Sequence, residues 1–157
     1  MISRPRAAVG GVIAAVMLVA GCSVTPSRDP SGQVTAAASA DPYAVSVGDC
    51  TGPLGTGTVS NLTLVPCDQA HYWEAYDQTT LTDQTYPGAS AVTTKANSFC
   101  SDSFRSWAGI STERTKYAMT YFYPTQETWT QAGDRQVVCF AGSDSGGITG
   151  TLKGVKK

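Results

Sequence analysis

The sequence predicts an α+β domain, in which a small antiparallel sheet carries one main helix on a face and two disulfides close the fold. Several short segments are rich in aromatic and β-branched residues, as strands are, whereas residues 89–107 place apolar side chains at steps of three and four, as a helix does. Strands precede and follow that single helix, which favours a layered α+β arrangement. An even set of four cysteines after residue 22 suits two disulfides.

Alternation of apolar and polar side chains predicts the strands. They are expected over residues 45–50, 59–65, 71–80, 116–123, 135–141 and 148–152. The strand at 135–141 is expected to be central, because its contiguous apolar run from Val137 to Phe140 suits burial on both faces. Residues 125–132 are expected to form a single helical turn that positions Trp129.

The main helix is expected over residues 89–107, with Ser90 as its N-cap and Gly109 as its stop. Its apolar stripe includes Cys100, which is therefore expected to face the sheet. A cysteine at that position suits a disulfide that ties the helix to a strand.

Residues 1–21 resemble a bacterial lipoprotein signal peptide. A basic start with Arg4 and Arg6 leads into an apolar run that is too short to span a bilayer, and small residues directly precede Cys22. This pattern predicts that the mature chain begins at Cys22 and carries a diacylglyceryl thioether there. The protein is then expected on the extracytoplasmic face of the cell membrane, held by its acyl chains. The alternative is an ordinary secretory signal in which the cysteine occurs by chance.

Residues 22–42 are expected to form a flexible tether, because this stretch has no aromatic residue, is rich in Ser, Ala and Thr, and contains Pro26, Pro30 and Pro42. A flexible chain of that length reaches roughly 25 Å. The folded domain is expected over residues 43–157.

The cysteines of the domain are Cys50, Cys67, Cys100 and Cys139. In an exported domain of this size they predict disulfides. A zinc site is the alternative, but the chain has no CxxC pair and only one histidine. Three pairings are possible. Sequence order and local geometry favour Cys50–Cys67 and Cys100–Cys139, each contributing about 3–4 kcal/mol of stability.

No catalytic motif is evident, so we expect no enzymatic activity, no cofactor and no metal ion. The chain has 11 basic and 12 acidic side chains and no basic patch, so nucleic acid is not an expected partner. The single histidine, His71, lies on the opposite strand face from Glu74, so the two are not expected to bind one ion. The aromatic residues Tyr72, Trp73, Tyr76, Tyr117, Tyr121, Phe122 and Tyr123 either line a sugar- or peptide-binding groove or belong largely to the core.

The order of several short motifs resembles the septum-formation domain family of actinobacterial membrane and exported proteins. Gly48-Asp49-Cys50 comes first, Val65-Pro66-Cys67 follows, and His71 and Glu74 come next. A final group contains Pro124, Trp129, Gly133-Asp134-Arg135 and Cys139. The family's usual Pro and Val beside this His and Glu are Ala70 and Ala75 here. The resemblance implies an exported, disulfide-bonded module with a part in cell division or envelope maintenance, and it implies no known activity.

We therefore expect a lipid-anchored, non-enzymatic interaction module with a partner in the envelope or the division machinery. The alternatives are a lipoprotein that binds a glycan or small ligand through an aromatic face, and a hydrolase that uses His71 or a spatial carboxylate pair. The residues that repeat the family pattern are His71, Glu74, Trp129, Asp134 and Arg135. They mark either a structural lock or a binding site, and we favour the lock. In it Trp129 is buried, Arg135 pairs with Glu74, and His71 bonds to backbone near Cys67.

Overall fold

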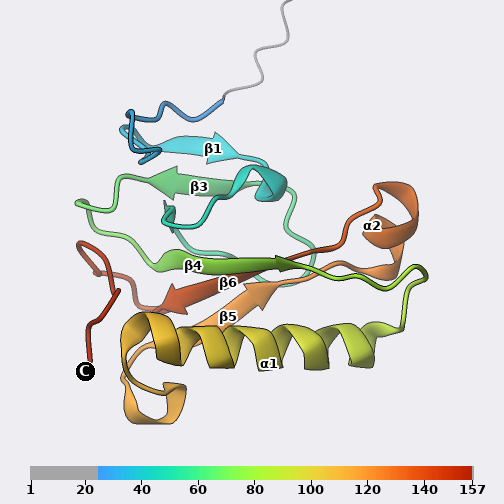
Figure 1. Ribbon diagram of the computed structural model, residues 1–157. Coiled ribbons are helices and arrows are strands. Elements are labelled where there is room, and N and C mark those ends of the chain that lie inside the picture. The colour runs from blue at the N-terminus through green and yellow to red at the C-terminus, as the bar shows by residue number, and fades with distance from the viewer. Residues whose placement is uncertain (1–24, 157) are drawn as a thin grey trace, which may run out of the picture.

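The computed structural model describes residues 25–156 and consists of one curled antiparallel sheet with a long helix against it (Figure 1). The strand order is β1-β3-β2-β4-β6-β5. The strands are β1 (Ala38–Ala40), β2 (Cys50–Thr51), β3 (Leu62–Val65), β4 (Trp73–Thr80), β5 (Ala118–Phe122) and β6 (Gln136–Gly142). The helical elements are α1 (Ala89–Ala108), α2 (Gln126–Gln131), and the short 3-10 helices η1 (Pro42–Ala44) and η2 (Thr112–Arg114). The predicted α+β class is confirmed.

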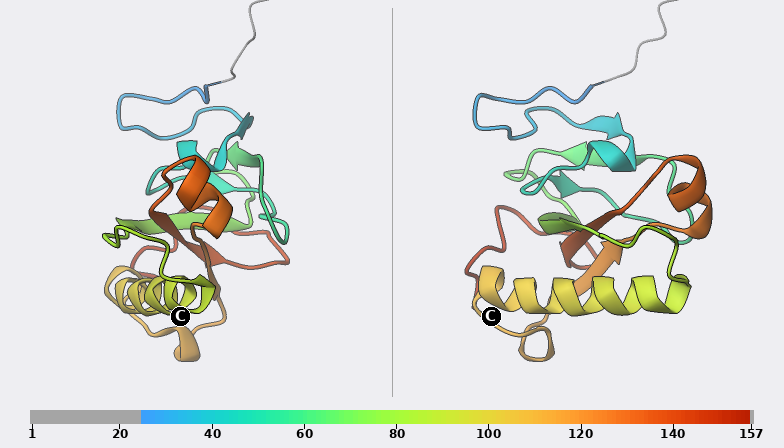
Figure 2. Two further views of the ribbon diagram at one scale, coloured as in Figure 1. Left: turned by 90° about the vertical axis from the view of Figure 1, so that its right-hand side faces the viewer. Right: turned by 45° about the vertical axis from the view of Figure 1, so that its right-hand side comes forward.

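Helix α1 packs against β4, β5 and β6, and lies at the opposite end of the molecule from β1 (Figure 2). Its buried residues recur every four positions, because that spacing returns to one helix face. They are Val92, Ala96, Cys100, Phe104 and Ala108. Gly109 ends the helix in a left-handed conformation with φ 73°, as predicted. The prediction for the start is wrong: Gly88, and not Ser90, is the N-cap residue, and it has no side chain to accept a bond.

The two faces of the sheet have separate apolar cores. Val137, Cys139 and Ala141 of β6 join the core beneath α1, whereas Val138 and Phe140 join the core on the other face. Since β6 pairs with β4 on one side and β5 on the other, its contiguous apolar run is buried from both faces. The prediction of a central strand here is confirmed.

The predicted disulfides are also confirmed. Cys50 is bonded to Cys67, which closes the connection between β2 and β3, and Cys100 is bonded to Cys139, which fixes α1 to β6. All of Cys50, Cys100 and Cys139 are fully buried. The two bonds therefore hold opposite parts of the domain.

Two predicted strands are shorter than expected. Of residues 45–50 only Cys50 enters a strand, because the preceding residues form a turn in which the Asp49 amide donates to the Ser46 carbonyl. Of residues 148–152 only Ile148 pairs, in an isolated bridge with His71. The C-terminal chain is instead held by single backbone hydrogen bonds, such as the one from the Gly150 amide to the Cys67 carbonyl, and by the side chain of Glu74.

The part of the predicted tether that the structure describes, residues 25–42, packs on the domain, which corrects the boundary at residue 43. Strand β1 pairs with β3, from Ala38 opposite Leu64 to Ala40 opposite Leu62. Val34 and Ala40 are buried, and Arg28 pairs with Val34 in a bridge. Composition does not predict this packing, because the free edge of β3 supplies backbone hydrogen bonds that do not depend on apolar side chains.

The predicted signal peptide and the predicted lipidation site Cys22 lie outside the described residues. Within residues 25–156, no helix is long and apolar enough to cross a membrane.

Candidate functional site

The residues of the family pattern fall into two clusters at opposite ends of the sheet. Glu74 lies opposite Ala141 where β4 begins, whereas Arg135 directly precedes Gln136, which pairs with Thr80 at the far end of β4. The predicted pair between Arg135 and Glu74 is therefore wrong. The length of β4 from Glu74 to Thr80 separates the Glu74 and Arg135 side chains, and each side chain bonds to other residues.

The first cluster fixes the C-terminal segment. His71 exchanges backbone hydrogen bonds with Ile148, at 2.8 and 3.1 Å. The carboxylate of Glu74 accepts one bond from the Thr151 hydroxyl at 2.6 Å and one from the Leu152 amide at 2.7 Å. Burial raises the pKa of Glu74 above its ordinary value, although these two bonds oppose the shift.

His71 itself is almost completely buried. Its Nδ1 lies 2.9 Å from the Gln69 carbonyl, two residues after Cys67, which matches the predicted backbone bond near that cysteine. Its Nε2 has no hydrogen-bond partner. No nucleophile of the described chain is bonded to this ring, so the contacts are those of a structural histidine.

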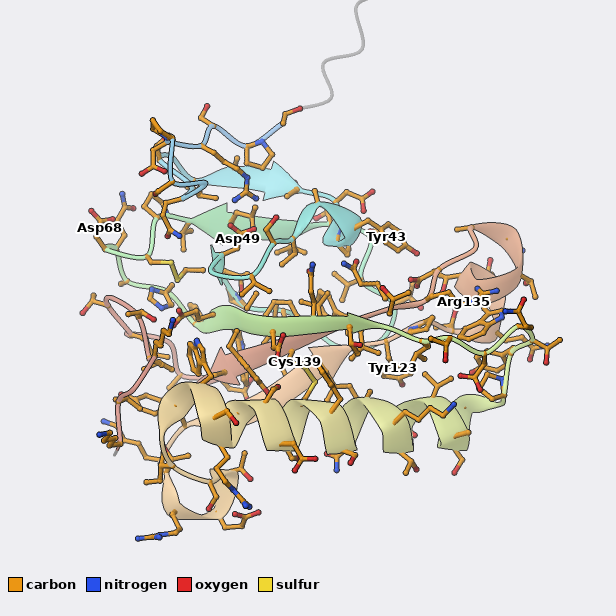
Figure 3. The ribbon with its side chains drawn as sticks, viewed as in Figure 1. Tyr43, Asp49, Asp68, Tyr123, Arg135 and Cys139 are labelled. Carbon is orange, nitrogen blue, oxygen red and sulfur yellow. A yellow bond between two sulfur atoms is a disulfide. The ribbon has the colours of Figure 1, made fainter. Side chains whose placement is uncertain are left out.

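The second cluster surrounds α2. Trp129 is buried at 3% exposure, and the Arg135 guanidinium lies 3.6 Å from the centre of its ring. Arg135 Nη1 also donates to the carbonyls of Trp129 and Asp134, at 3.0 and 2.8 Å. On another side the Trp129 ring meets Tyr86 edge-on. These contacts fix the turn into β6, as the structural lock predicts. Figure 3 labels Arg135 beside α2.

Asp134 connects this second cluster to an open pocket. Its Oδ1 accepts from the Gln136 amide at 2.9 Å, and its Oδ2 accepts from the Thr128 hydroxyl at 3.0 Å and from the Tyr43 hydroxyl at 3.4 Å. Thr125 and Thr128 form a capping box that begins α2. Partial burial, and then the charge of Asp134, raise the pKa of Tyr43. Tyr43 therefore remains a neutral donor toward the carboxylate.

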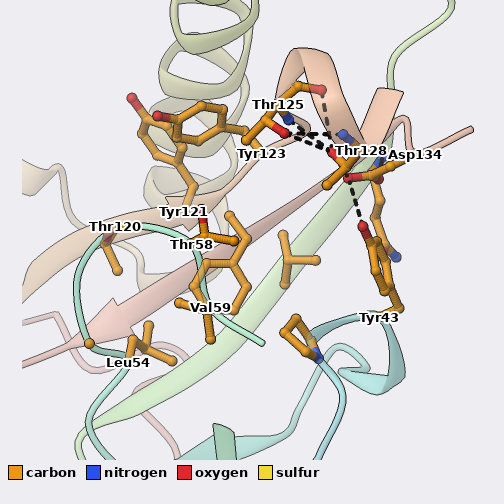
Figure 4. A pocket seen from close by; sticks show the side chains of 16 residues that line it. Tyr43, Leu54, Thr58, Val59, Thr120, Tyr121, Tyr123, Thr125, Thr128 and Asp134 are labelled. Carbon is orange, nitrogen blue, oxygen red and sulfur yellow. Dashed lines mark hydrogen bonds between the residues drawn. The ribbon is translucent and has the colours of Figure 1, made fainter. Parts of the chain in front are cut away.

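The pocket has a volume of about 460 Å³ and lies between η1, the loop that joins β2 to β3, the end of β5, and the start of α2 (Figure 4). We call it the tyrosine pocket because Tyr43, Tyr121 and Tyr123 line it. Figure 4 shows Tyr43 beside Asp134, and Tyr121 with Tyr123 together across the pocket. Leu54, Val59 and Val138 supply apolar surface.

The predicted aromatic face is only partly a surface. Trp73 and Tyr76 are core residues, and Tyr72 and Tyr117 pack against the two cores. Tyr121, Phe122 and Tyr123 line the tyrosine pocket. Sequence reasoning missed Tyr43 and the glycine-rich loop, and no local pattern relates them to Tyr123. The separation of Tyr43 from Asp134 by 91 residues is the reason.

A third polar contact was also missed. Arg28 makes a bidentate ion pair with Asp49, at 2.5 and 2.8 Å, and the Ser46 amide donates to the same carboxylate. Asp49 is buried at 2% exposure, and its hydrogen bond raises the pKa of the Arg28 guanidinium. Asp49 belongs to the Gly-Asp-Cys motif, which was the available signal. Its partner lies in the stretch that composition assigns to a tether.

In the part of the chain that the structure describes, no group of three or more His, Cys, Asp or Glu side chains is placed to hold a metal ion. The buried charged or polar side chains among the described residues are Asp49, Thr51, His71 and Glu74, and each makes a hydrogen bond within the fold. The tyrosine pocket is open, and Asp134 is the one carboxylate among its lining residues.

The fold and these clusters define a small α+β domain that is stabilised by disulfides and buried polar bonds, with a pocket at the α2 end. Residues 21–139 match the family described as septum formation. The chain therefore belongs to the septum formation family, and membership indicates a role in septum formation or cell division. No curated protein and no solved structure matches the chain.

Proposed function

We propose that the protein is a lipid-anchored binding module on the outer face of the cell membrane, and that it serves septum formation by holding an envelope or division partner. The tyrosine pocket carries this proposal. Its lining offers aromatic, hydroxyl and apolar surface. Among the described residues that line it, there is no histidine, no cysteine and no carboxylate besides Asp134. Such a lining suits binding, because acid–base or covalent chemistry needs a paired base or nucleophile.

The disulfides support the extracytoplasmic location. Cys50–Cys67 and Cys100–Cys139 both have bonding geometry in the structure, and such bonds persist mainly in oxidising compartments. The small residues directly before Cys22, which resemble the end of a lipoprotein signal peptide, support the anchor.

The docked N-terminal segment changes the expected reach of the domain. Since Arg28 is fixed to Asp49, only five residues separate a lipid on Cys22 from this fixed point of the folded surface. Fully extended, they span roughly 20 Å. The proposed module therefore works close to the bilayer surface, with the β1 edge nearer to the lipid than α1.

The test combines anchoring with division. Cys22→Ala is expected to move the protein from the detergent phase to the aqueous phase on phase partitioning. A fluorescent fusion of the parent chain is expected to concentrate at septa, and crosslinking in intact envelopes is expected to capture a partner through the tyrosine pocket. Unchanged partitioning of Cys22→Ala contradicts the anchor, and an even distribution of the parent over the envelope contradicts the septal role.

The alternative, a lipoprotein that binds a glycan or small ligand, differs in what the pocket holds. The exposure of Tyr43 and Tyr123 at the pocket favours it. A protein partner gives a discrete crosslinked species, whereas a small ligand gives saturable binding to the purified chain.

A further inference from the structure

We infer that the tyrosine pocket is a carbohydrate-binding site that takes a neutral sugar unit, with Tyr43 and Tyr123 as its stacking surfaces. The inference rests on the proposed function for the location of the domain, which must face the envelope, and it assigns to the pocket the glycan of the second candidate function in place of a protein partner. It adds the class of ligand and the residues that recognise it.

The tyrosine rings of the pocket are unusually exposed to solvent. Within residues 25–156 the large apolar side chains with high exposure are Tyr43 at 53%, Val47 at 49% and Tyr123 at 41%. Two of these three line the same pocket. Tyrosine offers a flat apolar ring and a polar hydroxyl, which suits a ligand that has both an apolar face and polar edges. A sugar ring has this character, since its C–H bonds cover one face and its hydroxyl groups surround the rim.

The charge of the pocket lining favours a neutral ligand. Asp134 is the only carboxylate in the lining, and no lysine, arginine or histidine accompanies it. A phosphate or carboxylate ligand is therefore disfavoured by repulsion. A cation is disfavoured because the carboxylate already accepts three hydrogen bonds, from Gln136, Thr128 and Tyr43. A neutral ligand meets neither difficulty.

The pocket lining also offers hydroxyl groups that make no hydrogen bond within the described chain. Thr58 and Thr120 line the pocket, and their hydroxyls have no hydrogen-bond partner within the described chain. A hydroxyl both donates and accepts, so these threonines match the hydroxyl groups of a sugar. The volume of about 460 Å³ lies in the range of small-molecule sites.

The pocket is also held in shape before any ligand arrives. The loop between β2 and β3 is closed by the Cys50–Cys67 bond and by the hydrogen bond from the Gly52 amide to the Thr63 carbonyl. Leu54 anchors that loop in the apolar core at 7% exposure. A preformed site loses less conformational entropy on binding.

The experiment measures binding by isothermal titration calorimetry with the full lipidated chain in detergent. The neutral probes are the tetramer of β-1,4-linked N-acetylglucosamine and cellotetraose, and hexalysine is the cationic probe. We expect at least one neutral tetramer to bind, and Tyr43→Ala and Tyr123→Ala each to weaken that binding about tenfold or more. Tyr123→Phe keeps the ring and is expected to retain most of the affinity.

Val47→Ala is the matched control, because Val47 is equally exposed but does not line the pocket. It is expected to bind like the parent, and circular dichroism shows whether each variant is folded. The inference is overturned if neither tetramer binds up to about 10 mM, if Tyr43→Ala and Tyr123→Ala bind like the parent, or if hexalysine alone binds. Detergent partitioning of the same preparation reports on the anchor separately, so failure of the pocket and failure of the proposed function are distinguished.

Discussion

Trp129 is the residue on which the α2 end of the domain depends most. Its ring is buried between the Arg135 guanidinium and Tyr86, and it holds the turn that carries Asp134 into the tyrosine pocket. Because Nε1 of Trp129 has no hydrogen-bond partner, the ring contributes through packing and cation–π contact and not through a hydrogen bond.

Trp129→Ala is therefore expected to lower the free energy of unfolding by about 3–5 kcal/mol. Trp129→Phe is expected to lose clearly less, because it keeps an aromatic ring and gives up no hydrogen bond. Thermal and urea unfolding measure both. If Trp129→Ala and His71→Ala melt like the parent, the structural lock is wrong and these residues become candidates for partner contact.

Glu74 gives the C-terminal segment a defined dependence on pH. Its folded pKa is raised by burial, so its stabilising contribution is fully present below the ordinary value of 4.5 and is lost as the pH rises through the folded pKa. Glu74→Gln removes this titration; its amide oxygen still accepts from the Leu152 amide, and its NH2 group donates to the Thr151 hydroxyl instead of accepting from it. We expect the unfolding free energy of Glu74→Gln, relative to the parent, to increase from pH 4 toward pH 7. Urea unfolding across that range measures the difference, and a difference that falls with pH contradicts the raised pKa.

At the scale of the element, the N-terminal segment is the least expected part of the fold. Strand β1 is only three residues long, and one ion pair, Arg28 with Asp49, holds the chain that precedes it. Asp49 is buried, whereas a quarter of the Arg28 side chain is exposed, so removing the carboxylate loses this charged hydrogen-bonded pair and the bond from the Ser46 amide without leaving a fully buried charge. The segment is thus expected to depend on Asp49 more than on its own apolar residues.

Asp49→Ala is expected to cost about 2 kcal/mol in unfolding free energy and to speed amide hydrogen exchange over residues 34–40. Asp83→Ala is the matched control, since its ion pair with Lys95 is exposed and its loss is expected to change neither quantity. Hydrogen exchange followed by mass spectrometry makes the comparison. Rapid exchange over residues 34–40 in the parent shows instead that the segment is a tether.

At the scale of the whole molecule, the two disulfides act in different places: Cys50–Cys67 reinforces two strands that the sheet already pairs, whereas Cys100–Cys139 joins α1 to β6. Cys50–Cys67 closes a separation of 17 residues and Cys100–Cys139 one of 39 residues. A disulfide that closes a longer loop removes more conformational entropy from the unfolded chain, and so stabilises the fold more.

Replacing both cysteines of a pair by alanine is expected to cost about 3 kcal/mol for Cys50–Cys67 and about 4 kcal/mol for Cys100–Cys139. The larger loss is expected for the second pair, because its loop is longer. Chemical unfolding of the two double variants tests the order. Equal stability of the Cys100–Cys139 variant and the parent contradicts a stabilising role for that bond.

Local patterns in the sequence were sufficient for the parts of the fold that local physics dictates. The apolar spacing of α1, its end at Gly109, the doubly buried run of β6 and the pairing of cysteines all follow from short-range spacing and burial. The motif order likewise indicated the family, which the match over residues 21–139 confirms. These features need no knowledge of which distant segments meet.

What only the tertiary structure decided are the contacts between segments far apart in the chain. Glu74 bonds to Leu152, 78 residues away, and Tyr43 reaches Asp134 across 91 residues. Strand β1 forms because the edge of β3 is free to pair, which composition does not report. The sequence alone therefore determined the class, the disulfides and the family, whereas the tyrosine pocket exists only because the folded sheet brings η1, the glycine-rich loop and the start of α2 together.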